Sequence, residues 1–290
     1  MFRRTAVLAG LALSFALTTA VHAQTELKLA ITDVVGLETL QREWGAFQKA
    51  LEARSGVKIA FFAVNNRTAA AEALRARRVD LVMTGPAEYV VMRARTDAVP
   101  VIAIQRVDYY PNVVVRADSG ITDVAGLKGK RVAFGSIGST SRHLGPMQLL
   151  ADLGLDPRSD IQATHVNSNI GFEALKRGDV AAMGMNYTDF QKLRQRDPTT
   201  PYFVLARGRD LPLDLILAGS HVDKGMVEKV RRAIADNAGE MTKAVLAGGG
   251  ENVKFADMVW VPSIRDEDYN YVRKMYRTIG QTQFSEFVGN

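Results

Sequence analysis

The chain has 290 residues, of which 47% are hydrophobic and 23% charged, and its net charge is +6. This composition is typical of a soluble globular protein, and the length predicts one large domain or two lobes of ordinary size. The sequence contains no cysteine, which excludes disulfides, thiolate chemistry and a lipidated N-terminal cysteine.

The N-terminus predicts export from the cytoplasm. A positively charged start, MFRR, precedes a short apolar stretch, and VHA then places small residues at both ends of a cleavage motif. This layout is typical of a secretory signal peptide spanning residues 1–23, cleaved after Ala23. Removal of Arg3 and Arg4 would lower the net charge from +6 to +4.

A modest positive charge favours anionic ligands and could equally favour nucleic acid. The densest basic run, Arg75–Arg78, follows a helical pattern and is best interpreted as a solvated helix end. We therefore expect no nucleic-acid partner. An exported protein without an anchor is retained by an outer membrane, so the sequence predicts a location in the periplasm.

Strands and helices alternate through the first third of the predicted mature chain. A strand at 26–32 precedes residues 36–56, whose apolar spacing is helical and whose last residue, Gly56, suits a helix C-cap. Asn66 or Thr68 is a candidate N-cap for the next helix. The further elements expected here are a strand at 57–64, a helix at 65–80, and strands at 80–86 and 98–105.

The alternation then restarts and ends in a helical tail. The expected strands lie within 112–120, 126–135, 161–166, 180–185, 202–208 and 213–219; the expected helices lie at 144–153 and 170–179, with two or three more after Lys224. This pattern predicts an α/β fold with largely parallel sheets. We expect one lobe at 24–110, an inserted second lobe at 111–214, and a return at 215–290. Ligands of such folds lie at the carboxyl ends of strands, here in a cleft between the lobes.

The segment FGSIGSTSRHLGP, residues 134–146, joins a strand to a helix with glycines and three consecutive hydroxyl residues. Helix N-termini carry free N–H groups and partial positive charge, and glycine lets an anion approach the backbone. A helix cap needs one hydroxyl, whereas Ser139, Thr140 and Ser141 supply three, which favours an oxyanion site over a cap alone. Pro146 is expected to kink or restart the helix.

The same segment resembles the signature of periplasmic phosphonate-, phosphite- and phosphate-binding proteins of ABC transporters. The stretches AEALRARRVDLVMTGPAEYVV, YYPNVVVRADSGITDVAGLKGKRVAFG and GFEALKRGDVAAMGMN also resemble family segments in the same order. The resemblance runs from about Glu26 to Lys229. It implies the type II periplasmic binding protein fold, in which two α/β lobes close on a ligand.

The resemblance also implies site residues. Ser139, Thr140 and Ser141 match the family's oxyanion-binding triplet, while Tyr109 and Asp214 match a tyrosine and an acidic residue of the cleft. The remaining candidates are Gly138 in the hydroxyl loop and Arg67 where the family often has a tyrosine. Ser168 or Asn169 lies nearest to the place where the family often has a histidine, and Asn169 is the candidate.

Two departures bear on the ligand. The family glutamate that meets an aminoalkyl group falls near Thr188, beside Asp189, and the added Arg67 favours a more anionic ligand through bidentate contact. Arg67 could also be a surface residue. We expect a small inorganic oxyanion or simple phosphonate rather than an aminoalkyl phosphonate. Glu88 or Asp214 could accept a hydrogen bond from a protonated ligand oxygen, which would disfavour sulfate.

The predicted function is a monomeric solute-binding component of an ABC importer, with an inner-membrane permease as partner. The alternative is a binding protein that presents its anion to the ectodomain of a sensor kinase. The sequence has no nucleophile elbow and no HExxH motif, so we expect no enzyme activity, no metal and no cofactor. Arg142 and His143 could add charge to the site or point outward.

Overall fold

The structure is a computed structural model that describes residues 26–285. The predicted signal peptide lies outside these residues. Within them, no helix combines the length and the apolar character that a membrane span requires.

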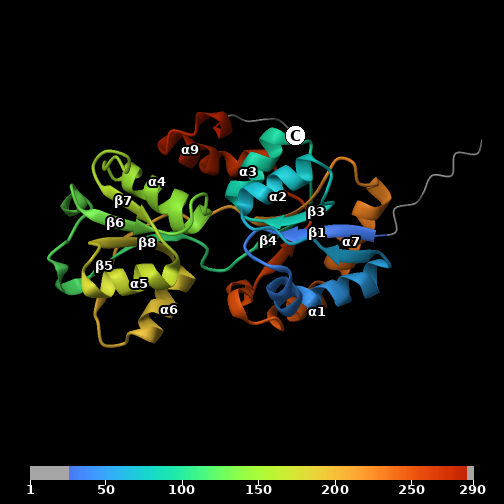
Figure 1. The fold of residues 1–290 in the computed structure, drawn as a ribbon, viewed down its shortest axis with the longest axis horizontal. Helices are drawn as coiled ribbons and strands as arrows, with labels where there is room; N and C mark the ends of the chain where they lie inside the picture. Colours follow the sequence, from blue (N-terminus) through green and yellow to red (C-terminus); the bar gives the residue numbers. More distant parts are fainter. Residues whose placement is uncertain (1–25, 286–290) are drawn as a thin grey trace, which may run out of the picture.

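Two β-sheets lie side by side, each covered by helices on both faces (Figure 1). The six-stranded sheet runs β11 (Val259–Val261), β4 (Val99–Gln105), β10 (Asp214–Ala218), β3 (Leu81–Thr84), β1 (Glu26–Ile31) and β2 (Lys58–Phe61). The five-stranded sheet runs β7 (Gln162–His165), β6 (Arg131–Phe134), β8 (Ala182–Asn186), β5 (Pro111–Arg116) and β9 (Tyr202–Arg207). We call the first sheet with its helices the six-stranded half, and the second sheet with its helices the five-stranded half.

The expected largely parallel pairing is wrong, because both sheets are mixed. Strands β1, β2 and β3 pair in parallel, as do β6, β7 and β8. Strands β4, β10 and β11 pair antiparallel in the first sheet, and β5 pairs antiparallel with β8 and β9 in the second. The chain crosses between the halves after β4 and again after β9, and the strand that follows each crossing, β5 or β10, runs opposite to its neighbours in the sheet it enters.

Nine α-helices occur within residues 26–285. They are α1 (Leu37–Ser55), α2 (Arg67–Arg75), α3 (Pro86–Arg95), α4 (Gly145–Asp152), α5 (Ser168–Arg177), α6 (Tyr187–Arg196), α7 (Lys224–Asp236), α8 (Ala238–Leu246) and α9 (Asn270–Thr278). Three of them, α3, α6 and α9, bear on the cleft. The sequence pattern missed α3 and α6 because each follows its strand directly, and α3 begins at the Gly-Pro pair that ends the strand expected at 80–86.

Local signals account for the boundaries that were expected. Gly56 ends α1 in the left-handed conformation, and the Asn66 side chain accepts the N–H of Ala69 at the start of α2. Pro146 lies in the first turn of α4, and a π-helical turn at Thr140–Leu144 precedes that helix. The expected restart at this proline is therefore confirmed.

The core of the six-stranded half has two layers. One face of the sheet packs on α1, α7 and α8 around Trp44, Phe47 and Phe255, and the other packs on α2, α3 and α9. Strand β1 serves both layers, because Leu29 faces one and Ala30 the other. The five-stranded half has α4 on one face and α5 and α6 on the other.

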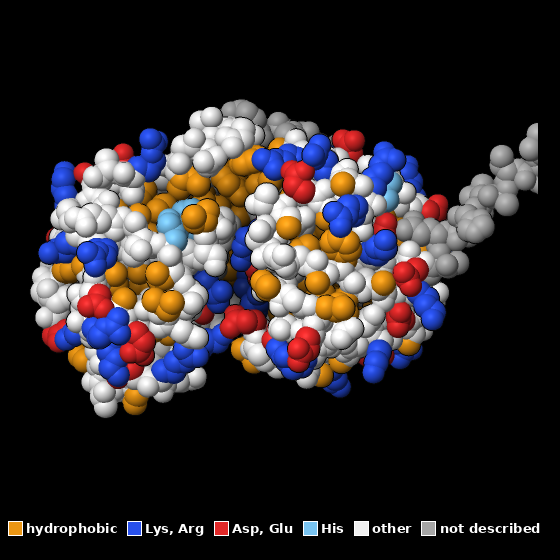
Figure 2. Space-filling view, in the orientation of Figure 1, with side chains coloured by type: hydrophobic (Ala, Val, Ile, Leu, Met, Phe, Trp, Pro, Cys, Tyr) orange, Lys and Arg blue, Asp and Glu red, His pale blue; other side chains and the backbone are white. Residues whose placement is uncertain are grey.

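Helix α9 contacts both halves. Lys274 pairs with Asp152 of α4 at 2.6 Å, while the Tyr276 hydroxyl donates to the carbonyl of Ala87 in α3 at 3.0 Å. Figure 1 shows α9 above the junction of the halves. The lobe boundaries expected at 110 and 214 stay predictions. The space-filling view in Figure 2 shows a groove between the halves with charged side chains along it.

Candidate functional site

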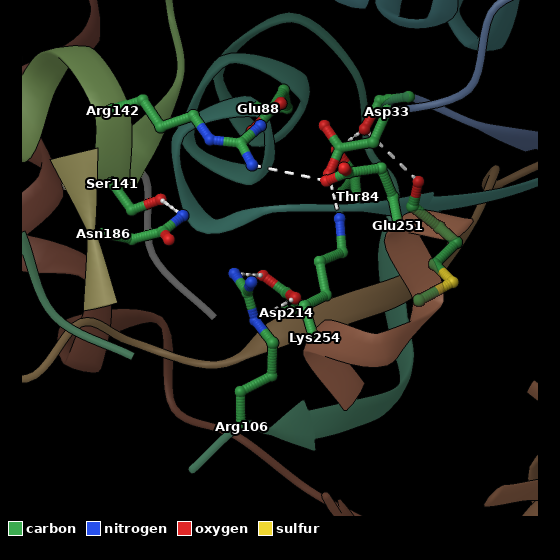
Figure 3. Close-up of polar contacts among 12 residues, drawn as sticks. Asp33, Thr84, Glu88, Arg106, Ser141, Arg142, Asn186, Asp214, Glu251 and Lys254 are labelled. Carbon is green, nitrogen blue, oxygen red and sulfur yellow. Dashed lines mark hydrogen bonds and ion pairs between the residues drawn. The ribbon is translucent and has the colours of Figure 1, made fainter. Parts of the chain in front are cut away.

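A cavity of about 30 Å³ lies between the two halves at the carboxyl ends of several strands. Its lining comes from both sides of the groove (Figure 3). The six-stranded half and the crossing after β4 contribute Asp33, Arg67, Gly85, Glu88, Arg106, Tyr109, Asp214 and Lys254; the five-stranded half contributes Ser139, Thr140, Ser141, Arg142 and Asn186. We call this space the interhalf cavity.

The hydroxyl loop forms the wall from the five-stranded half. Ser139, Thr140 and Ser141 are all buried, and the Asn186 side chain at the end of β8 donates to the Ser141 hydroxyl at 3.2 Å. The Thr140 hydroxyl crosses the groove and accepts the N–H of Ala87 at 3.0 Å. One hydroxyl of the triplet thus caps a helix of the opposite half.

The opposite wall includes the N-terminus of α3. Gly85 is the N-cap residue of this helix. Glycine has no side chain that could accept a free N–H group there, and the helix has no side-chain cap of its own. A Cβ placed on Gly85 would lie 3.0 Å from Glu88, 3.6 Å from Thr140 and 3.7 Å from Asp214. Glycine at this position therefore keeps the cavity open where the halves meet.

Three cations from the six-stranded half reach the cavity, and carboxylates hold each of them. Arg67 pairs with Asp33 at 2.5 Å and with Glu88, and Lys254 pairs with Asp33 at 2.7 Å. Arg106 pairs with Asp214 at 2.8 Å, and its guanidinium lies 3.4 Å from the centre of the Tyr109 ring. The positive groups are thus fixed in place before any anion arrives.

Burial and these ion pairs shift the pKa values of three groups that line the cavity. Burial alone would raise the pKa of Asp33, but Arg67 and Lys254 outweigh it and hold the pKa well below the usual value. Burial raises the pKa of Asp214 against the opposing charge of Arg106. Burial also raises the pKa of Tyr109 to about 12, so its hydroxyl keeps its proton at neutral pH.

Arg142 faces the groove and connects the two halves. Its guanidinium binds Asp189 of its own half at 2.5 and 2.9 Å, and it reaches Glu251 of the six-stranded half at 3.3 Å. Lys192 also binds Glu251, at 2.9 Å. Of the two options that the sequence left open for Arg142, the structure supports added charge at the site.

His143 takes neither of the positions considered for it. Its side chain is buried, and Nδ1 accepts the N–H of Gly138 at 3.0 Å. Burial, with a smaller contribution from His165, lowers the pKa of His143 to about 3. A neutral imidazole therefore shapes the hydroxyl loop from behind.

The structure brings six of the eight predicted site residues to the interhalf cavity: Arg67, Tyr109, Ser139, Thr140, Ser141 and Asp214. Gly138 and Asn169 lie outside it. The N–H of Gly138 is taken by His143, and the Asn169 side chain binds Arg196 beside a separate cavity of about 240 Å³. Arg67 was also weighed as a surface residue, but its side chain lies in the cavity wall.

Several lining residues were not predicted from the sequence, and most of them follow strands. Asp33, Gly85 and Arg106 lie just beyond β1, β3 and β4, and Asn186 ends β8. The rule that ligands gather at carboxyl ends of strands could have selected them. Lys254 lies in a 3₁₀ segment of the C-terminal part, Gly250–Phe255, and no sequence signal marks it.

Comparison with known proteins gives a consistent family and fold. Residues 31–268 match the sequence model of a family described as ABC transporter, phosphonate, periplasmic substrate-binding protein. PhnD1 from Prochlorococcus marinus, solved in complex with methylphosphonate, has a TM-score of 0.71 at 18% identity over 89% of this chain and 99% of that one. A binding protein component of an ABC phosphonate transporter from Pseudomonas aeruginosa has a TM-score of 0.68 at 18% identity over 89% and 88%.

The sulphonate binder SsuA from Escherichia coli, a periplasmic protein for aliphatic sulphonates, has a TM-score of 0.62 at 18% identity over 92% of this chain and 93% of that one. Likeness at these identities establishes the fold, which is the expected type II periplasmic binding protein fold with two α/β halves.

Proposed function

The chain belongs to the family of periplasmic substrate-binding proteins of phosphonate ABC transporters, and we propose that it binds a small phosphorus oxyanion (a phosphonate, phosphite or phosphate) in the interhalf cavity and delivers it to a permease. The observation that carries the proposal is the convergence of three hydroxyl residues with Arg67, Arg106 and Lys254 on one buried space. Hydrogen bonds from such donors to an anion are stronger than neutral ones.

The size of the cavity supports a compact head group. About 30 Å³ accommodates roughly two water molecules, so an oxyanion enters only when side chains or the halves move. Arg67 is well placed to make that adjustment, because its guanidinium pairs with two carboxylates at once, Asp33 and Glu88. The anion would take the place of one carboxylate oxygen on the guanidinium.

The charges favour a ligand without an ammonium group. Asp189 lies near the position where some family members have a glutamate for an aminoalkyl group, but here Arg142 and Ser168 both bind it. A carboxylate already neutralised by arginine gains little from a second cation. This supports a simple phosphonate or inorganic anion over an aminoalkyl phosphonate.

Buried carboxylates supply a basis for selecting phosphorus over sulfur. Asp214 and Glu88 line the cavity as hydrogen-bond acceptors. A phosphorus oxyanion that carries one proton can donate to such an acceptor, whereas sulfate at neutral pH has none to donate and would be repelled. We therefore propose that sulfate binds more weakly than phosphorus oxyanions of similar size.

Calorimetry on the mature chain with phosphate, phosphite, methylphosphonate and sulfate tests the proposal. We expect tight binding of at least one phosphorus oxyanion and a loss of about tenfold or more in Ser139→Ala. Ser136→Ala is the matched control, because Ser136 lies in the same loop but is exposed and outside the cavity. If all four anions fail to bind, or if both variants weaken binding equally, the proposal is wrong.

We also propose transport, without turnover of the ligand, as the role of binding. Hydroxyl and guanidinium groups hold an anion, but hydrolysis would need a nucleophile activated by an adjacent base. The transport proposal follows the description of the family, which is that of ABC transporter substrate-binding proteins. Deletion of the gene should abolish growth on the bound anion as sole phosphorus source; unchanged growth with altered kinase-dependent transcription would favour sensing instead.

A further inference from the structure

A second, larger cavity adjoins the interhalf cavity. Its volume is about 290 Å³, and Arg67 and Glu88 line both spaces. The remaining lining comes from α2, α3, the loop before the hydroxyl triplet, α9 and the segment that follows α9. The Arg67–Glu88 ion pair is therefore the boundary between a polar space and its neighbour.

The neighbouring cavity differs in chemistry from the interhalf cavity. Apolar side chains dominate its lining, among them Val91, Ile137, Tyr276 and Phe284. Tyr276 and Phe284 form an edge-to-face pair with ring centres 5.3 Å apart. Figure 2 shows hydrophobic side chains gathered where the halves meet beneath the C-terminal helices. Binding sites for organic groups are concave, mostly apolar and bounded by a few polar groups.

Ile137 gives this cavity an exposed apolar wall. Its side chain is 72% exposed, although it lies only two residues before the buried triplet that begins at Ser139. A large aliphatic side chain exposed beside a binding cavity is a candidate ligand contact. The loop that supplies the hydroxyls for an oxyanion thus also presents a hydrophobic residue to the adjoining space.

We propose that this apolar cavity takes the organic substituent of a phosphonate whose head group lies in the interhalf cavity. The inference rests on the proposed function and names its substrate class: phosphonates with an alkyl or aryl substituent larger than methyl. The head group would bind Arg67 from the polar side, the ion pair with Glu88 would open, and the substituent would pass between them. Each methylene group removed from water would then add to affinity.

The test compares methylphosphonate, n-butylphosphonate and phenylphosphonate by calorimetry on the full mature chain. We expect the two larger ligands to bind about tenfold or more tightly than methylphosphonate. Ile137→Asn should remove that preference while retaining methylphosphonate binding, because it places an uncharged polar group in the apolar wall. Ile170→Asn is the matched control, since Ile170 is also exposed, at 54%, and lies outside the cavity.

The outcomes separate this inference from the proposed function. Binding of methylphosphonate with equal or weaker binding of the larger ligands would overturn the inference alone. Failure of all phosphonates and inorganic anions to bind would overturn both. A preference for larger ligands that appears only after removal of residues 286–290 would assign the cavity to the chain's own C-terminus and would also overturn the inference.

Discussion

The Thr140 hydroxyl differs in role from its two neighbours. All three residues line the cavity, but only the Thr140 hydroxyl also accepts a hydrogen bond from Ala87 of the other half. Three consecutive hydroxyls exceed the one that a helix cap requires. The structure gives one of them a capping role across the groove, a contact between residues 53 positions apart that no local pattern could indicate.

Among the charged residues of the cavity, some were predicted from the sequence and their ion-pair partners were not. Arg67 and Asp214 were predicted from their place in a family pattern, and both line the cavity. Their partners Asp33 and Arg106 were missed, because an ion pair between distant segments depends on tertiary packing that residue spacing does not encode. The local motif therefore predicted one member of each pair, and the fold supplied the other.

His143 makes the stability of the protein depend on pH. Its pKa in the folded chain is about 3, mainly because of burial, whereas an unfolded histidine has a pKa of about 6.5. Between these values the unfolded chain binds a proton that the folded chain does not, so stability falls as the pH falls from about 6.5 towards 3.

The variant His143→Asn isolates this effect, because the amide oxygen can still accept the N–H of Gly138 and does not titrate. Between about pH 6.5 and pH 4.5 the wild type should lose about 2 kcal/mol more in free energy of unfolding than the variant does. Urea denaturation at both pH values measures the difference. Parallel curves for the two proteins would rule out titration of this residue.

At the scale of elements, alternation of strands and helices was predicted well where turns separate them. The sequence predicted the hydroxyl loop, the restart at Pro146 and the caps at Gly56 and Asn66, all of which depend on local chemistry. It missed α3 and α6, which directly follow β3 and β8, and it missed strand direction. Direction depends on how the chain crosses between sheets, which is a property of the whole topology.

The N-terminus of α3 is the element whose position most directly limits the cavity. Gly85 has φ −85°, which any residue can adopt, so Gly85→Ala should fold normally. The added methyl group would lie against Glu88, Thr140 and Asp214 and would occupy space needed by the ligand. We expect about a tenfold loss of oxyanion affinity with little change in the unfolding midpoint.

Gly45→Ala in α1 is the control for this prediction, because nothing lies within 4 Å of the added Cβ and the same substitution should slightly stabilise a helix. Titration calorimetry and thermal unfolding on both variants give the two readouts. Undiminished affinity in Gly85→Ala would place the ligand away from α3.

At the scale of the whole molecule, the two halves are held together across the groove by ions as well as by the hydroxyl of Thr140. Glu251 from the six-stranded half binds Arg142 and Lys192 from the five-stranded half. Burial alone would raise the pKa of Glu251, but Lys192 and Arg142 lower it to about 2, so the carboxylate is ionised throughout the neutral range. These pairs stabilise the arrangement of the two halves seen in the structure.

This arrangement predicts that Glu251→Gln weakens ligand binding without touching the predicted ligand contacts. Binding to a closed form is weakened in proportion to any decrease in its population. The Glu251 side chain is 49% exposed, so the pairs are partly screened and contribute at most about 1 kcal/mol, which corresponds to an affinity loss of up to about fivefold. Small-angle scattering should show a larger ligand-free molecule, and the difference from wild type should shrink at high salt.

Glu240→Gln is the matched control, because Glu240 pairs with Arg54 at 2.6 Å entirely within the six-stranded half. It removes an exposed ion pair of similar kind but cannot change how the halves meet. Equal effects of the two variants would mean that surface charge, rather than contact across the groove, sets the affinity. An effect confined to Glu251→Gln would mean that part of the binding free energy is determined by how far the empty protein is already closed.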